Sequence, residues 1–233
     1  MKLYIEEKMN KTFLFIIALL SFSFANAQYE WDAPKETKAK YNVINPMINN
    51  TISVKLGNKW GVVDESDKTI LPFKYDFIRD VVDADWIFGT YNPNIVTVKL
   101  GNKWGVINRT NGETVIPIKY DTIGIFLGGG GGFAPAKFKN KWGFFDKQGK
   151  NTIPLLYDSV GYFARPNESG YASDCAAVKQ NGKLGFIDKT GKVVYPFIID
   201  LVQFYTNYPD DPVAFLINGK WIEMRDMKID NYN

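Results

Sequence analysis

Short apolar runs alternate with polar or glycine pairs along this chain, and the alternation recurs at a fixed spacing. Residues 54–62 read VKLGNKWGV, and residues 98–106 read the same nine letters. Related segments follow at 137–144, 179–186 and 216–221. The recurring Trp therefore falls about every 40 residues, although the fourth copy has Leu184 instead. A period of this length is typical of a small unit that buries its apolar face against its neighbours.

Each of the five segments has the pattern of a tight β-hairpin. A pair such as Gly57-Asn58 or Asn181-Gly182 stands between two runs rich in β-branched and aromatic residues. Loops of two such residues favour the primed turns that match the twist of paired strands. The other three pairs are Gly101-Asn102, Lys139-Asn140 and Asn218-Gly219. We predict five hairpins, with Lys139 in an unfavourable backbone conformation.

A second turn follows each hairpin. In Asp146–Gly149 and Asp188–Gly191, Asp stands first and Gly fourth, which suits a type I turn closed by a left-handed glycine. Asn108–Gly112 is one residue longer, and Asp67 occupies the glycine position of the first unit, so that turn should be the most strained.

A β-branched run then leads to a proline, where we expect the strand to stop because proline lacks an amide hydrogen. Four residues after each proline stands an aspartate, which we expect to accept backbone N–H groups. The prolines are Pro72, Pro117, Pro154 and Pro196, and the aspartates are Asp76, Asp121, Asp158 and Asp200. The mature chain shows no helical periodicity. We predict an all-β fold in which each unit is an antiparallel meander of three or four short strands.

These motifs resemble the WG repeat family, whose units read approximately Gly-Lys-Trp-Gly-Phe-Ile-Asp and then Pro-x-Lys-Tyr-Asp. Residues 141–146 and 72–76 match this pattern closely, and the resemblance covers about residues 38–224. Leu184 and Ile199 depart from it in the fourth unit. The resemblance implies an exported or cell-envelope repeat protein used for interaction, and it implies no reaction.

The first residues are predicted to be a signal peptide. Lys8 and Lys11 precede a short apolar run, which ends in the small-x-small pattern Ala25-Asn26-Ala27. The run is too short to span a membrane as a helix. We predict a signal peptide at 1–27, with translation starting at Met1 or Met9, and a periplasmic or secreted mature protein without a transmembrane segment.

Residues 28–233 are predicted to form a single repeat domain. The chain begins with the closing part of a unit and ends with an opening hairpin, so the two ends are complementary. A propeller-like ring would join them and hide two sheet edges, and we favour it over an open β-solenoid. The whole units are expected at about 51–92, 93–135, 136–174 and 175–212, with partial units at 38–50 and 213–224.

The composition narrows the possible chemistry. There is no histidine, so Ser-His and Cys-His nucleophile pairs and histidine metal sites are excluded. The single Cys175 cannot build a zinc site or an internal disulfide, and we expect it to be buried. The mature chain has 25 basic and 23 acidic residues, so it lacks the excess of positive charge that is typical of nucleic-acid-binding proteins. We expect no metal and no cofactor, since Asp80, Asp83 and Asp85 lack the spacing of a calcium loop.

Function is expected in the segments that differ between units, because the repeated residues are needed for packing. The repeated residues predicted to be structural are Trp60, Trp104, Trp142, Trp221, Gly61, Gly105, Gly143 and Gly185. The candidate binding residues are aromatic side chains among polar neighbours: Trp86, Tyr91, Tyr171 and Tyr208.

We predict a non-catalytic exported module that mediates protein–protein interaction in the cell envelope or outside the cell. The alternative is a glycan-binding module that uses these exposed loop aromatics. A third hypothesis is a carboxylate-based hydrolase, which would need two carboxyl groups about 5–9 Å apart across a cleft.

Overall fold

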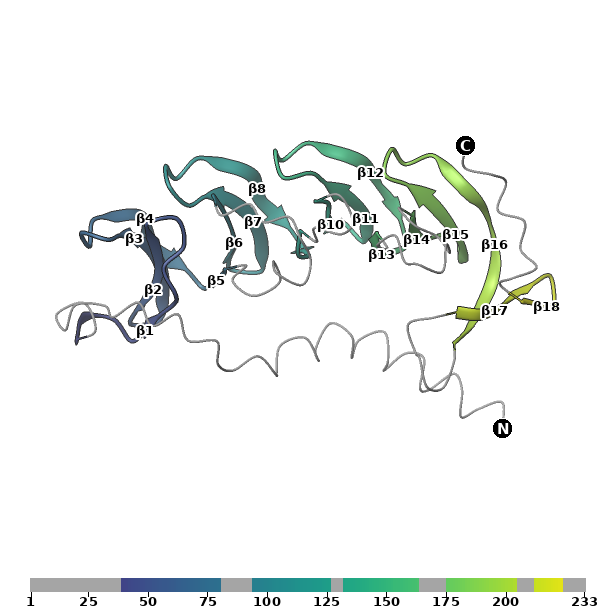
Figure 1. The fold of residues 1–233 in the computed structure, drawn as a ribbon, viewed down its shortest axis with the longest axis horizontal. Helices are drawn as coiled ribbons and strands as arrows, with labels where there is room; N and C mark the ends of the chain where they lie inside the picture. Colours follow the sequence, from purple (N-terminus) through teal and green to yellow (C-terminus); the bar gives the residue numbers. More distant parts are fainter. Residues whose placement is uncertain (1–38, 81–93, 127–131, 164–174, 205–211, 224–233) are drawn as a thin grey trace. The chain divides into compact units, whose positions relative to one another are not determined.

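The computed structural model describes residues 39–80, 94–126, 132–163, 175–204 and 212–223. The chain divides into two compact units, Met1–Asp32 and Ala33–Asn233, and all described residues belong to the second. The predicted signal peptide lies outside the described residues. Apart from two helical residues at 39 and 40, the regular structure of the described part is β-strand, which confirms the all-β fold (Figure 1). The described part contains no helix long and apolar enough to cross a membrane.

The strands form four antiparallel sheets of consecutive strands. The first contains β1 (Val43–Ile44), β2 (Thr51–Leu56), β3 (Lys59–Asp64) and β4 (Thr69–Tyr75). The second contains β5 (Phe77–Arg79), β6 (Ile95–Leu100), β7 (Lys103–Asn108) and β8 (Thr114–Tyr120). The third contains β9 (Thr122–Ile123), β10 (Ala134–Phe138), β11 (Lys141–Phe145) and β12 (Asn151–Tyr157).

The fourth sheet has six strands because its fourth strand continues into a further hairpin. It contains β13 (Ser159–Phe163), β14 (Cys175–Gln180), β15 (Lys183–Asp188), β16 (Val193–Phe204), β17 (Pro212–Ile217) and β18 (Lys220–Glu223). The 12-residue β16 pairs with β15 through its first part and with β17 through its second part (Figure 1).

The sheets are offset from the sequence repeats by one strand. β5 belongs to the first sequence unit, yet it pairs with β6 of the second unit. β9 and β13 start the third and fourth sheets in the same way. Each sheet is therefore completed by the preceding unit, so neighbouring units are joined by backbone hydrogen bonds.

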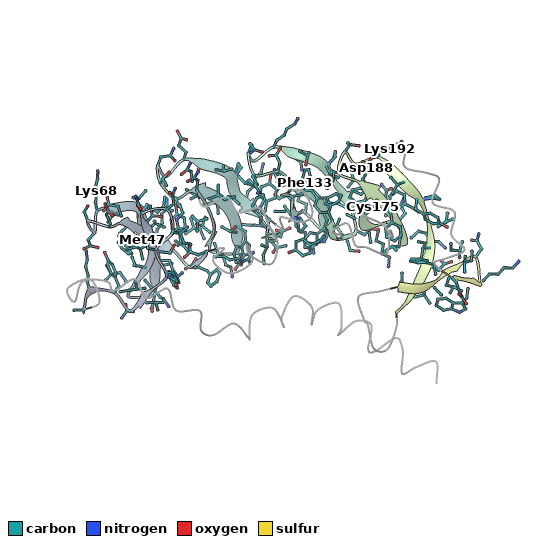
Figure 2. The ribbon with its side chains drawn as sticks, in the orientation of Figure 1. Met47, Lys68, Phe133, Cys175, Asp188 and Lys192 are labelled. Carbon is teal, nitrogen blue, oxygen red and sulfur yellow. The ribbon has the colours of Figure 1, made fainter. Side chains whose placement is uncertain are left out.

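The turn residues adopt the conformations that their chemistry predicts. Asn181 and Gly182 both have positive φ, 52° and 80°, as a type I′ turn requires. Lys139 has φ 49° in the equivalent turn, which confirms the unfavourable conformation predicted for it. Asp67 has φ 65°, where three other units have glycine. In the following turn of the fourth unit, the Asp188 carboxylate accepts the Lys192 amide at 3.0 Å (Figure 2).

The glycine after Trp60, Trp104, Trp142 and Leu184 is explained by a bulge in the neighbouring strand. Trp60 pairs with Tyr75 and Val62 with Leu71, so Gly61 alone faces residues 72–74. A Cβ atom on Gly61 would lie 2.8 Å from the Leu71 carbonyl oxygen. The corresponding distances are 2.8 Å at Gly105, 2.4 Å at Gly143 and 2.8 Å at Gly185. Only glycine permits this close approach.

The prolines lie inside these bulges and do not end the strands, so that expectation was wrong. Pro72 is the first of the three residues facing Gly61, and β4 continues to Tyr75. A bulge leaves a residue outside the hydrogen-bond ladder, so it tolerates proline without the loss of a bond.

The core lies between consecutive sheets. Val62 and Leu71 of the first sheet pack with Val96 and Val98 of the second, and all four are at most 2% exposed. Similar clusters join the second sheet to the third and the third to the fourth. Among the described strands, β1 pairs with β2 and β18 with β17, and no pairing joins the two ends. The ring therefore stays a prediction.

Candidate functional site

A row of three side chains crosses each sheet beside its hairpin turn. In the first sheet, Lys55 pairs with Trp60, and Trp60 pairs with Tyr75. The same row is Lys99, Trp104 and Tyr120 in the second sheet, Lys137, Trp142 and Tyr157 in the third, and Lys179, Leu184 and Ile199 in the fourth. We call these the Lys–Trp–Tyr rows.

The indoles of the first three rows are half-buried and pack against the inter-sheet clusters. The Lys99 Nζ lies 5.8 Å from the centre of the Trp104 ring, and the Lys137 Nζ lies 5.9 Å from that of Trp142. These distances allow cation–π attraction. Trp221 differs, since its partner on β17 is Leu216 and it is 52% exposed.

An aspartate connects each hairpin to the next. The Asp76 Oδ1 accepts a hydrogen bond from Lys59 Nζ at 2.5 Å, and its Oδ2 accepts the Gly101 amide of the following hairpin at 2.6 Å. Asn42 begins the series by accepting the Gly57 amide at 2.6 Å. The remaining ion pairs are Lys103–Asp121, Lys141–Asp158 and Lys183–Asp200. We call the four pairs the Lys–Asp ladder.

The predicted role of these aspartates as backbone acceptors is confirmed for Asp76, Asp158 and Asp200. Their ion pairs were not predicted from the sequence, although a lysine directly precedes the Trp or Leu of all five hairpins. The Lys59 ammonium and the Gly101 amide hold the pKa of Asp76 below its ordinary value. The lysine partner is likewise the main cause that lowers the pKa of Asp121, Asp158 and Asp200.

A buried polar network joins the first two sheets. The Arg109 and Asp80 side chains are 1% and 2% exposed, and Arg109 NH1 lies 3.0 Å from Asp80 Oδ1. Arg109 Nε donates to Thr51 Oγ1 at 2.6 Å, while Asp80 accepts from Ser53 Oγ at 2.8 Å and Asn45 Nδ2 at 2.6 Å. Such a pair stays buried only when hydrogen bonds satisfy its remaining groups, as they do here.

The same network fixes both ends of the segment between β5 and β6. Asp80 precedes this segment and Asn94 follows it. The Arg109 side chain binds Asp80, and its backbone N–H donates to the Asn94 carbonyl at 2.8 Å. Asn49 Nδ2 also donates to Asn94 Oδ1 at 2.5 Å. Only the extra residue in the Arg109 turn indicated this role in the sequence.

The four aromatic candidates lie outside the described residues. Trp86 and Tyr91 belong to 81–93, Tyr171 to 164–174, and Tyr208 to 205–211. Their role as binding residues stays a prediction. Cys175 is buried on β14, as expected (Figure 2). Within the described ranges, no three side chains of the metal-binding types gather into a metal site.

Comparison with known proteins gives a family match and a weak structural likeness. No curated protein shows significant similarity to the chain. The solved structure of Hsv2p from Kluyveromyces lactis is similar at 15% identity, with a TM-score of 0.37. The similarity covers 77% of this chain and 59% of the Hsv2p chain, so this chain spans less than two thirds of that protein.

The family model described as "WG containing repeat" matches residues 60–84, 104–142, 142–183 and 185–221. These matches cover more than half of the chain. They include Trp60, Trp104, Trp142 and Trp221, and all four glycines that face a bulge lie within them. The chain therefore belongs to the WG repeat family.

Proposed function

We propose that this protein is a non-catalytic, exported interaction module that presents the variable segments linking β5 to β6, β9 to β10, β13 to β14 and β16 to β17 to a protein partner. The partner would lie in the cell envelope or outside the cell. Membership of a repeat family supports this role. The repeated residues support it too, since the rows and the ladder use them for packing and for joining sheets.

The observation that carries the proposal is the buried network around Arg109. A buried ion pair adds little stability compared with apolar packing, so its presence favours a role in fixing geometry. It fixes Asp80 and Asn94, the two residues that bracket the segment containing Trp86 and Tyr91. Anchored ends reduce the conformational entropy that a binding segment loses on contact with its partner.

Two further features support a role without catalysis. The chain has no histidine. Each ladder carboxylate is held by a lysine, which makes it a poor general acid at neutral pH.

We further propose that the ring closes at β18. The first three sheets end on strands that carry Pro72, Pro117 or Pro154, and proline protects a strand edge. β18 has no proline and carries the exposed Trp221. Deletion of residues 28–38 should then increase hydrogen exchange at the amides of 220–223. Unchanged exchange there would favour the open stack.

Capture from a native envelope extract tests the function. The mature protein should retain a specific protein, and the double variant Trp86→Ala/Tyr91→Ala should lose it. Leu156→Ala is the matched control, because Leu156 is 53% exposed on a strand and should be neutral. Equal loss in both variants, or no protein retained above an unrelated bait, would contradict the proposal.

Two other measurements bear on the proposal. Saturable binding on a glycan array that Trp86→Ala or Tyr208→Ala abolishes would replace the protein partner with a glycan. Cell fractionation tests export, and a cytoplasmic protein that keeps residues 1–27 would refute it.

A further inference from the structure

The hairpin turns and the ladder form one continuous edge of the domain. Asp76 binds Lys59 of the first hairpin and Gly101 of the second, so these two turns lie side by side. Asp158 and Asp200 join the third hairpin to the fourth and the fourth to the fifth in the same way. Asp121 binds Lys103 of the second hairpin, and the Lys139 amide of the third lowers the pKa of Asp121 by hydrogen bonding. We call residues 55–60, 99–104, 137–142, 179–184 and 216–221 the hairpin edge.

The hairpin edge carries more positive charge than the ladder neutralises. Its lysines are Lys55, Lys59, Lys99, Lys103, Lys137, Lys139, Lys141, Lys179, Lys183 and Lys220. These ten face the four ladder aspartates, and the edge itself contains no acidic residue. About one net positive charge therefore remains for each hairpin. The whole chain has a formal net charge of only +3, so positive charge is concentrated here.

The surplus belongs mainly to the lysines of the Lys–Trp–Tyr rows. Within the described part of the chain, Lys55, Lys99, Lys137 and Lys179 form no ion pair. Lys99 still acts on Asp76, whose pKa it helps to lower after Lys59 and the Gly101 amide. Each ladder carboxylate is already bound to another lysine and cannot neutralise the row lysine as well.

In the first two sheets, exposed apolar residues neighbour the row lysines. Val43 pairs with Lys55, and Phe77 pairs with Lys99. Val43 is 41% exposed and Phe77 is 42% exposed. Leu56 and Leu100, which follow the row lysines, are 42% and 39% exposed. In the first two sheets, the edge therefore combines one surplus charge with a small apolar surface.

We propose that the hairpin edge binds an acidic polysaccharide, a polymer whose sugar rings carry carboxylate groups. A surface that repeats the same groups in successive sheets fits a ligand that is itself periodic. Lysine offers a point charge, which suits single carboxylates, and the edge has no arginine fork for bidentate phosphate contacts. The apolar surface would contact the faces of the sugar rings.

The charge density favours a polymer whose charges are more widely spaced than those of a nucleic acid. Packed sheets lie about 10 Å apart, so the edge offers about one net charge over that distance. Double-stranded DNA carries one charge per roughly 1.7 Å. The hairpin edge is separate from the strand-linking segments proposed for the protein partner, so this inference goes beyond the proposed function.

Polygalacturonate immobilised on a biosensor tests the inference, with dextran as the neutral polymer. At an ionic strength of about 20 mM, where screening is weak, the mature protein should bind polygalacturonate saturably and dextran not at all. Lys99→Gln/Lys137→Gln should weaken binding about tenfold, since two charge contacts are lost. Binding should also become less sensitive to salt.

Lys150→Gln/Lys192→Gln is the matched control. It makes the same change in charge at exposed lysines of the second turns, outside the hairpin edge, and should change affinity less than twofold. Equal weakening by both pairs, no saturable binding by the unaltered protein, or equal binding to duplex DNA would overturn the proposal. Trp86→Ala/Tyr91→Ala should keep polygalacturonate binding. Failure of the polysaccharide proposal can therefore be distinguished from failure of the protein-partner proposal.

Discussion

Trp60 and Trp221 occupy the same position in the same kind of hairpin, yet their surroundings differ. Trp60 is half-buried between Lys55 and Tyr75, because β4 runs alongside β3. Trp221 is 52% exposed, and β18 is the last strand of its sheet among the described residues. The hairpin positions the indole, and the strand that follows the hairpin buries it.

The residue after the Trp makes the same distinction. It is glycine in the four units where a bulged strand crosses it, and it is Ile222 after Trp221. Glycine is therefore needed where the bulged strand passes close to this position, and the hairpin itself does not require it. Four predictions test this difference between the complete units and the terminal hairpin, in order of decreasing expected effect.

Gly143→Ala should have the largest effect. The new Cβ would lie 2.4 Å from the Ile153 carbonyl oxygen, so the bulged strand would have to move. We expect a loss of about 3 kcal/mol in the free energy of unfolding, measured with urea. Gly161→Ala is the control, because its Cβ would meet the nearest atom at 3.6 Å. A similar small loss in both variants would show that no strand crosses at Gly143.

Substitution of a tryptophan should cost more stability in an internal Lys–Trp–Tyr row than in the last hairpin. The Trp104 ring lies 5.9 Å from the Phe77 ring centre and 4.8 Å from Arg79 Cζ, and it packs on the inter-sheet cluster. Trp104→Ala should destabilise the protein by about 2 kcal/mol, less than a fully buried indole would cost. Trp221→Ala should cost less than about 0.5 kcal/mol, as exposed substitutions usually do. Equal losses would mean that Trp221 is covered in solution.

Ladder substitutions should give a smaller effect. Asp158→Asn removes the ion pair with Lys141 and weakens acceptance of the Gly182 amide. We expect a small fall in the thermal midpoint and faster hydrogen exchange at Gly182. Lys220→Gln is the comparison in the terminal hairpin, and it should leave both the midpoint and the exchange unchanged. Faster exchange in both variants would indicate a general charge effect.

Lowering the pH should destabilise the folded protein, because it protonates the aspartates of the Lys–Asp ladder. The pKa of Asp76, Asp121, Asp158 and Asp200 is lower in the folded protein than the ordinary carboxyl value of about 3.9. Their contribution is therefore complete above that value and is lost as the pH falls through the folded pKa. High salt should reduce the contribution at neutral pH. Urea titrations across this range would contradict the ladder's role if stability rose on acidification.

Local features were predictable because neighbouring residues determine them. The turn residues identified the five hairpins, and Lys139 and Asp67 adopt the unfavourable conformations that their positions require. The recurring Trp, Gly, Pro and Asp identified the family. The assumption that each unit forms its own meander was incomplete, since the last strand of each unit pairs with the next.

The candidate site was only partly predictable, because its interacting residues lie far apart in the sequence. The ladder aspartates were identified as backbone acceptors, but their lysine partners lie 17 or 18 positions away. The Arg109 network joins residues up to 58 positions apart, and only one extra turn residue indicated it. The four candidate aromatics stay predictions.

By itself, the sequence determined the strand pattern, the turn types and the repeat, because alternation and backbone preference act over a few residues. The tertiary structure decided which unit completes each sheet, where the strands cross the glycines, and how charges pair along the hairpin edge. It also decided that Arg109 is buried and that Trp221 is exposed. These outcomes depend on which distant segment packs against each residue, and local sequence preferences carry no information about that segment.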